Sequence, residues 1–189
     1  MSAAPELVVL VNEQNEPIGT ALKADVHTSD TPLHRGFSVF VFNLKGELLL
    51  QQRARTKKTW PLVWSNSCCG HPAPDEATVD AARRRLMDEL SININDVQIM
   101  LPDYRYRAER DGIVENEVCP VLVARYDGAV VPNLKEVENT KWIPWDDFLK
   151  KAEIGDGNFS PWCTEEARLL DSSQDFRRWM SADQRDTSD

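Results

Sequence analysis

The sequence predicts a layered α/β or α+β fold, because strand-like and helix-like patterns alternate along its 189 residues. Two apolar runs rich in Val and Phe, at 6–12 and 37–43, are typical of strands. Residues 75–90 have the clearest helical pattern, since apolar side chains three and four positions apart form one stripe. Both element types bury their apolar faces by packing in layers around one core.

The other elements follow in chain order. A turn at 44–47 and an apolar run at 48–53 predict a hairpin with the preceding strand. Further strands are expected at 103–107, 115–126 and 141–143, and further helices at 144–153 and 160–170. Proline near the start of each of these two helices suits the first helical turn, and Ser160 is placed to cap the second one.

Length and composition indicate a single domain over residues 1–180, followed by a polar C-terminal tail at 181–189. Hydrophobic residues make up 41% of the chain, which is enough for a sizeable core. Charged residues make up 28% and are spread along the sequence, so wholesale disorder is not expected.

The formal net charge of −9 argues against a nucleic-acid partner, because nucleic-acid binding needs a basic face. A small anionic ligand such as a diphosphate would require a local basic patch. No apolar run is long enough to span a membrane, and the N-terminal residues lack the pattern of a signal peptide. Two of the four cysteines are adjacent, which suits a disulfide scaffold poorly, so we expect a reducing, cytoplasmic location.

The three histidines, His27, His34 and His71, all lie in polar, turn-rich segments. Glu115 and Glu117 stand two apart in an expected strand, so their side chains point to the same face. Three imidazoles and two carboxylates suit a divalent cation with more ligands than a structural zinc site. Spacing alone leaves a metal site and a solvated strand face equally open.

A pair of cysteines, Cys68 and Cys69, precedes Gly70 and His71. A nearby cation or metal would make one of them a reactive thiol, whereas a buried small residue is the simpler interpretation of each. In an extended segment the two side chains alternate, so only one can face a site that contains His71.

The segment from Gly70 to Glu89 resembles the Nudix signature, a loop–helix–loop in which helical carboxylates bind Mg²⁺ against a diphosphate. The residues depart from that signature at three positions, because Arg85 and Asp88 replace glutamates and Ser91 replaces a glycine. A box with a cation in place of a carboxylate is poorly suited to the metal cluster of Nudix hydrolases.

Together with these departures, several fragments between Val8 and about Trp162 resemble the type 1 isopentenyl diphosphate isomerase family. They are Lys23, His27–Asp30, Leu33-His34, Phe37-Ser38, Arg53-Ala54, Lys57-Lys58, Trp60-Pro61, Trp64, Asn66-Ser67, Cys69–Pro72, Tyr104–Ala108, Gly112–Pro120 and Ser160–Trp162. The resemblance implies a Nudix-like α/β/α sandwich with a mixed sheet. Position 68 varies in that family, so Cys68 is expected to be a packing residue.

The resemblance also implies the reaction, in which isopentenyl diphosphate and dimethylallyl diphosphate interconvert through a carbocation-like state. Cys69 and Glu117 match the acid–base pair of the family. Tyr106 is expected to hydrogen-bond near Glu117, and Trp162 to lie over the hydrocarbon and stabilise the cation.

Three groups of binding residues follow from the same resemblance. A divalent metal, Mn²⁺, Zn²⁺ or Mg²⁺, is expected on His27, His34, His71, Glu115 and Glu117. Glu89 and the backbone carbonyl of Cys69 are expected to hold a Mg²⁺ that arrives with the diphosphate. Lys23, Arg53, Lys57 and Arg85 are expected to contact the phosphates. The expected partner is thus a small-molecule diphosphate, and the expected assembly is a monomer or a weak homodimer.

Two alternatives remain. A Nudix hydrolase of nucleoside diphosphate compounds would share the fold and Mg²⁺, but it predicts a glutamate-rich box where Arg85 stands. A non-catalytic metal-binding module would use Cys and His, but the chain lacks a paired Cys-x-x-Cys frame.

Overall fold

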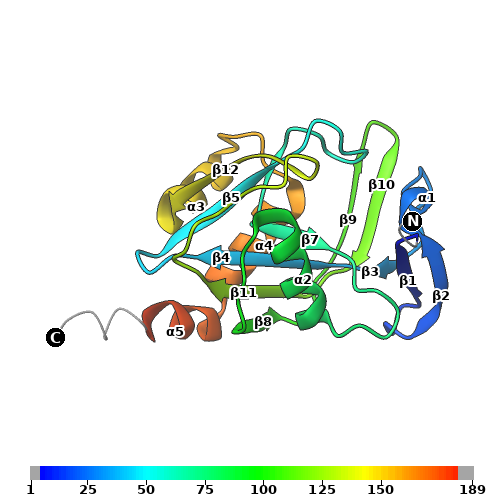
Figure 1. Ribbon diagram of the computed structural model, residues 1–189, viewed down its shortest axis with the longest axis horizontal. Helices are drawn as coiled ribbons and strands as arrows, with labels where there is room; N and C mark the ends of the chain where they lie inside the picture. The colour runs from blue at the N-terminus through cyan, green and yellow to red at the C-terminus, as the bar shows by residue number, and fades with distance from the viewer. Residues whose placement is uncertain (1–4, 183–189) are drawn as a thin grey trace.

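Figure 1 shows a computed structural model of the chain, which describes residues 5–182. One sheet has five strands in the order β2-β1-β3-β10-β9. Its strands are β1 (Leu7–Val11), β2 (Pro17–Leu22), β3 (His34–Arg35), β9 (Arg105–Arg110) and β10 (Ile113–Val118). In this sheet β3 runs parallel to β10, whereas β9 runs antiparallel to it.

A second, seven-stranded sheet has the order β12-β5-β4-β11-β8, with β6 paired to β5 and β7 paired to β4. Its strands are β4 (Phe37–Phe42), β5 (Glu47–Arg53), β6 (Trp64–Ser65), β7 (Cys68–Gly70), β8 (Val97–Leu101), β11 (Val121–Arg125) and β12 (Val137–Pro144). Because β11 runs parallel to β4 and antiparallel to β8, the sheet is mixed, as expected from the sequence.

Helices cover both faces of the seven-stranded sheet (Figure 1). Alternate side chains of β4 divide between two cores: Val39 and Val41 pack with α2, and Phe40 and Phe42 pack on the other side. The helices are α1 (Lys23–Val26), α2 (Thr78–Leu90), α3 (Trp145–Ile154), α4 (Pro161–Ser172) and α5 (Gln174–Ala182). The expected α/β/α sandwich is therefore confirmed.

The chain crosses between the two sheets at two adjacent points. Residues 115–126 were expected to form one strand, but Cys119 and Pro120 separate β10 from β11. Pro120 has no N–H to donate to a ladder. Gly36 separates β3 from β4 in the same way, and its N–H donates to the carbonyl of Val118 at 2.9 Å. Each crossing places residues from the end of one sheet beside those of the other.

Several sequence expectations differ from the structure at their boundaries. The helix expected from Asp75 begins at Thr78, because Asp75 adopts a left-handed conformation with φ of 62°. Ser160 stands at the N-cap of α4 but makes no side-chain cap bond, since its Oγ lies 2.8 Å from Oγ of Ser65 instead.

Other elements were not anticipated, namely β2, β3, β6, β7, β8, α1 and α5. Helix α5 continues to Ala182, so the polar tail expected at 181–189 begins within a helix, and its residues 183–189 lie outside the described part of the chain. Within residues 5–182, none of the helices combines the length and the apolar character that a membrane crossing requires.

Candidate active site

A cavity of about 540 Å³ lies where the two sheets meet. Residues of β7, β9 and β10, the start of α4 and the loop after β5 contribute to its walls. Most of the side chains that the sequence singled out line it: Lys23, His27, Arg53, Lys57, Cys69, His71, Arg85, Tyr106, Glu115, Glu117 and Trp162. The other two, His34 and Glu89, are almost completely buried next to residues of this wall.

Strand pairing brings the histidines and Glu117 together. In the parallel register of β3 and β10, Glu117 stands opposite His34. The Oε1 of Glu117 lies 3.1 Å from Nε2 of His71 and 3.5 Å from Nε2 of His34. One potential ligand atom from each of His27, His34, His71 and Glu117 lies within 4.8 Å of the others.

Neighbouring groups orient this cluster. The Nδ1 of His34 lies 2.9 Å from the carbonyl oxygen of Pro32, so a proton there directs the lone pair of Nε2 into the cluster. Gly36 leaves room for Glu117, since a Cβ at position 36 would lie 1.9 Å from Oε2 of that carboxylate. Sequence reasoning missed this role of Gly36, although the glycine follows His34 by only two residues.

The second carboxylate, Glu115, lies at the edge of the cluster. Its Oε2 is 3.4 Å from Nε2 of His27 and accepts a 3.4 Å hydrogen bond from the hydroxyl group of Tyr106. The hydrogen bond that the sequence predicted near Glu117 goes to Glu115, two residues away on the same strand. Tyr106 does stand opposite Glu117 in the register, but its long ring leans along the strand to the diagonal neighbour.

The electrostatics of the cluster favour the ligand forms of Glu117 and His71. Burial raises the pKa of Glu117, but His71 and His34 outweigh it and hold that pKa well below the usual range. Burial lowers the pKa of His71. Burial also opposes protonation of His34, but its hydrogen bond with Glu117 leaves the pKa raised. An ionised carboxylate and a neutral imidazole are the forms that bind metals.

The donor set fits a divalent cation. His27 Nε2 and His71 Nδ1 are buried without a hydrogen-bond partner among the described residues. A buried polar nitrogen without a partner costs free energy, and a cation at the cluster would satisfy His27 Nε2. Three imidazoles with a carboxylate suit Zn²⁺ or Mn²⁺ as well as Mg²⁺.

The two adjacent cysteines point to opposite sides of β7. Cys68 is buried in the core beneath α2, whereas Cys69 lines the cavity, which confirms that only one of them faces His71. The Cys69 Sγ lies 3.2 Å from Oδ1 of Asn66 and 3.5 Å from Oγ of Ser38. Burial raises the pKa of Cys69 to about 12, so its thiol keeps its proton at neutral pH.

Aromatic rings close one side of the cavity. Trp162, at the start of α4, is 2% exposed, and its ring centroid lies 5.4 Å from that of Tyr106 and 5.2 Å from that of Trp60. The guanidinium of Arg53 lies over the Trp162 ring at 5.8 Å. This wall offers a π-face and little water to a ligand.

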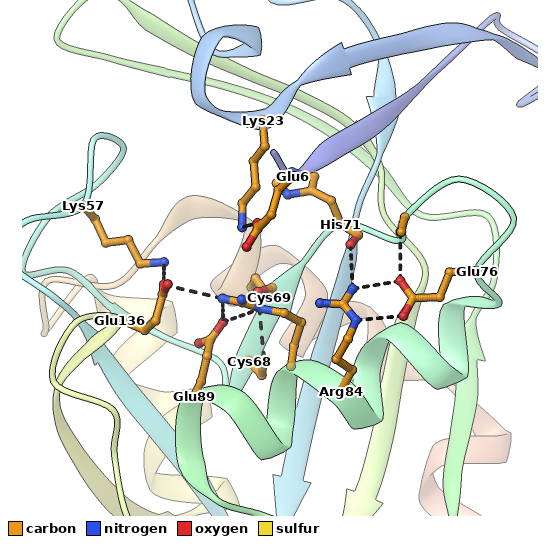
Figure 2. Close-up of polar contacts among 12 residues, drawn as sticks. Glu6, Lys23, Lys57, Cys68, Cys69, His71, Glu76, Arg84, Glu89 and Glu136 are labelled. Atoms are coloured by element: carbon orange, nitrogen blue, oxygen red, sulfur yellow. Dashed lines mark hydrogen bonds and ion pairs between the residues drawn. The ribbon is translucent and has the colours of Figure 1, made fainter. Parts of the chain in front are cut away.

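The expected phosphate-binding cations are engaged with carboxylates or carbonyls in this structure. Lys23 Nζ lies 2.5 Å from Glu6, and Arg85 Nη2 lies 2.5 Å from Oε1 of Glu89. Lys57 pairs with Glu136 (Figure 2). Arg53 donates to the carbonyl and the hydroxyl oxygen of Thr59.

A second ion pair holds the loop that carries His71. Arg84 donates two 2.8 Å hydrogen bonds to Glu76, and its Nη2 lies 3.5 Å from the carbonyl oxygen of His71 (Figure 2). Glu76 in turn accepts a 2.8 Å bond from the N–H of Ala73. Both residues belong to the 70–89 pattern, and the pair fixes the loop between β7 and α2.

A buried carboxyl group behind Cys69 also escaped sequence reasoning. Glu166 of α4 is completely buried, and its Oε2 has no hydrogen-bond partner in the described structure. Burial raises the pKa of Glu166 well above its usual range, and the nearby hydroxyl of Ser38 offsets this only in part. The available signal was its position on the apolar stripe of Cys163, Ala167 and Leu170.

Comparisons with known proteins agree with the fold. The NUDIX domain family matches residues 32–163. The isopentenyl-diphosphate Delta-isomerase of Saccharopolyspora erythraea is 47% identical over 186 residues, covering 97% of this chain and 96% of the relative. The protein of the same name from Mycolicibacterium vanbaalenii is 48% identical over 169 residues, covering 89% of this chain and 93% of the relative.

Two solved structures share the fold. DR0079 from Deinococcus radiodurans superposes with a TM-score of 0.70 at 21% identity, covering 87% of this chain and 98% of that one. The MutT protein from Methanosarcina mazei Go1 gives a TM-score of 0.60 at 18% identity, covering 79% and 96% of the two chains.

Proposed function

Because the chain belongs to the NUDIX family and to the isopentenyl-diphosphate Delta-isomerases, we propose that it interconverts isopentenyl diphosphate and dimethylallyl diphosphate, with Cys69 and Glu117 as the acid–base pair. One observation carries this assignment. Cys69 comes from the seven-stranded sheet and Glu117 from the five-stranded sheet, yet both line the same cavity. A five-carbon chain between them would meet a proton donor and a proton acceptor.

The protonation states suit this role. The pKa of Cys69, raised by burial, keeps a proton on the thiol, while the lowered pKa of Glu117 leaves its carboxylate free to accept one. Movement of the double bond requires one proton to be added to a carbon and another to leave a different carbon. In the reverse direction the donor and the acceptor exchange roles.

The aromatic wall supports the carbocation-like state. An unactivated alkene becomes strongly electron-deficient on protonation, and a ring face stabilises positive charge. We assign Trp162 to this role, and Tyr106 to shielding beside it, because both rings line the cavity with their centroids 5.4 Å apart. Exclusion of water there also prevents capture of the cation.

We propose that His27, His34, His71, Glu115 and Glu117 hold one divalent metal, Mn²⁺, Zn²⁺ or Mg²⁺. When bound, this ion would supply a fixed positive charge that makes a proton on Glu117 more readily transferred. Glu115 accepts the Tyr106 hydroxyl bond and lies beside His27, which supports a ligand or orienting role rather than proton transfer.

We assign the diphosphate to Lys23, Arg53, Lys57 and Arg85, which line the same cavity. Guanidinium groups bind phosphate oxygens through paired hydrogen bonds. We assign Glu89 and the carbonyl of Cys69 to a Mg²⁺ that enters with the diphosphate. Arg85 engages Oε1 of Glu89, so Oε2 is the oxygen that we assign to this ion.

Further parts of the proposal concern the whole chain. We propose that residues 1–180 act as one domain, because both sheets contribute to one cavity. The four free cysteines support a reducing, cytoplasmic location. A small-molecule diphosphate is the proposed partner, without nucleic acid or membrane, and the proposed assembly is a monomer or a weak homodimer.

Incubation of the purified protein with isopentenyl diphosphate and Mg²⁺ tests the function against its alternative. The proposal predicts dimethylallyl diphosphate as the product with the diphosphate intact, measured by ³¹P and ¹H NMR. A Nudix hydrolase would instead release phosphate from isopentenyl diphosphate or from nucleoside diphosphate compounds. Phosphate release without isomerisation would contradict the proposal.

A further inference from the structure

Glu136 is a cavity-lining carboxylate that has no part in the proton chemistry above. It directly precedes β12, whose first residue, Val137, pairs with Arg53 of β5. Its own carbonyl accepts a 3.0 Å bond from the N–H of Ala54, and its N–H donates to Asn133 at 2.9 Å. The backbone at 136 is therefore fixed, and the side chain has a defined starting point at the cavity wall.

The carboxylate of Glu136 bridges two of the expected phosphate-binding cations. It forms an ion pair with Lys57, and its Oε2 lies 3.4 Å from Nη2 of Arg85 (Figure 2). Burial raises the pKa of Glu136, but the charges of Lys57, Arg85 and Lys23 outweigh it and leave the pKa lowered. Glu136 is thus an anion at neutral pH and occupies the partners that a phosphate group would use.

The net charge of the site decides whether it can neutralise a free diphosphate. Its four expected cations, Lys23, Arg53, Lys57 and Arg85, face three carboxylates, Glu6, Glu89 and Glu136. These seven side chains leave a single net positive charge. One phosphoryl group alone carries about −1.5 to −2 at pH 7, so a free diphosphate is not neutralised there. A divalent cation supplies the missing charge and a new partner for a displaced carboxylate.

We infer that Glu136 is a specificity-determining residue that makes the site bind a metal-complexed diphosphate in preference to the free diphosphate. In the absence of substrate it holds Lys57 and Arg85, and a diphosphate must displace it. Without a metal, the displaced carboxylate repels the ligand, whereas with a metal its charge is compensated. The inference rests on the proposed function, because it takes the diphosphate group as the ligand of this part of the cavity.

By linkage, the metal then strengthens diphosphate binding by the same factor as the diphosphate strengthens metal binding. Neutralising Glu136 should weaken this coupling. Glu136→Gln keeps the size of the side chain and removes its charge. The matched control is Glu138→Gln, because Glu138 lies only two residues further along the chain, within β12, and pairs with the exposed Arg55 outside the cavity.

The experiment is calorimetric titration of the full chain with inorganic pyrophosphate, once with a chelator and once with saturating Mg²⁺. For Glu136→Gln, we expect metal-free pyrophosphate to bind at least tenfold tighter than to the parent, with less than a threefold change in Mg²⁺. Glu138→Gln should resemble the parent in both conditions. Glu136→Ala also removes the charge, with a smaller side chain. It should shift the ratio of the pyrophosphate affinity in Mg²⁺ to that in chelator in the same direction, and it replaces the Gln variant if that variant folds poorly.

Equal effects with and without Mg²⁺, or the same shift in Glu138→Gln, would overturn the inference. Isomerisation of isopentenyl diphosphate by the parent protein, measured on the same preparation, separates the two levels of the proposal. If the parent isomerises its substrate but Glu136→Gln does not shift the ratio of the two pyrophosphate affinities, only the role of Glu136 fails. If the parent does not isomerise it, the proposed function fails whatever the titrations show.

Discussion

Oε1 of Glu117 lies 3.1 Å from Nε2 of His71, although Glu117 belongs to the five-stranded sheet and His71 directly follows β7 of the seven-stranded sheet. The contact joins the expected proton-transfer carboxylate to the histidine cluster. It arises because the chain crosses between the sheets at Gly36 and again at Cys119-Pro120. The site therefore depends on how the two sheets meet, and we propose a separate role for each of its carboxylates.

Glu117→Gln should lose turnover far more than metal binding. The amide keeps the shape and one ligand oxygen of the carboxylate but cannot accept a proton, and proton transfer by a positioned group contributes about 10²–10⁴ in rate. Glu115→Gln should instead weaken metal binding, and excess metal should restore part of its rate. Both glutamates are about 5% exposed, so the comparison reports role rather than location. Equal rescue of both variants by metal would reduce Glu117 to a ligand.

Replacing His27, His34 or His71 with Asn should lower bound metal and activity together. Loss of an outer-shell partner typically costs 10–100-fold in metal affinity, so loss of a ligand should cost at least as much. Metal content after dialysis, measured by mass spectrometry, gives the result directly. Full stoichiometric metal in all three variants would show that the cluster does not hold the ion.

Gly36→Ala should damage the site without removing any of its ligands. The added Cβ would lie 1.9 Å from Oε2 and 2.7 Å from Cδ of Glu117, so that carboxylate must move away from His34 and His71. We expect at least a tenfold loss of metal affinity and of turnover. Gly36 N–H donates to Val118, and Ala retains this bond, so the far-ultraviolet circular dichroism should be unchanged. Parent-like metal binding would show that the space at Gly36 is not needed.

Glu166→Gln should make the protein more stable at neutral and alkaline pH. Burial raises the folded-state pKa of Glu166 above the ordinary value of 4.5. The stability that protonated Glu166 contributes is therefore fully present below pH 4.5, and it is lost as the pH rises towards the folded-state pKa. The advantage of the neutral Gln should therefore grow by up to about 1.4 kcal/mol per pH unit above 4.5.

The groups that interact with Glu166 are Ser38, Cys69, Tyr104, Glu117 and Cys119 from neighbouring segments, and Cys163 and Glu165 from its own helix. None of them is a cation, so ionisation of Glu166 finds no compensating charge among them. Urea unfolding between pH 4 and pH 8 measures the effect, with the exposed neighbour Glu165→Gln as control. A constant difference between the Glu166 variant and the parent across this range would mean that Glu166 is already ionised.

Local patterns were sufficient to predict several elements. The 3.6-residue period of α2 and the apolar runs of β1, β4 and β5 are properties of short segments, so their existence could be read without tertiary information. The break within the strand expected at 115–126 could not be predicted locally, because only the paired crossing at Gly36 shows why the chain changes sheets at Pro120.

The site residues themselves came from motif resemblance, whereas their contacts did not. Glu117 and His34 are neighbours because β3 and β10 pair in parallel, which no local pattern specifies. The contact from Tyr106 to Glu115 depends on how one ring leans along its strand. Glu136 carried no sequence signal, because its importance lies in the two cations that folding brings to it.

Deuterium incorporation from D₂O into isopentenyl diphosphate and dimethylallyl diphosphate tests the acid–base account most directly, with Cys69→Ala and Cys68→Ala compared to the parent protein. The parent should exchange deuterium into both compounds. Cys69→Ala should lose about 10²–10⁴ of this rate while it remains folded, because Cys69, unlike Cys68, lines the cavity. Cys68→Ala should keep most of the rate, since its side chain packs beneath α2. Comparable exchange in the two variants would contradict the assignment of Cys69 and the acid–base pair built on it.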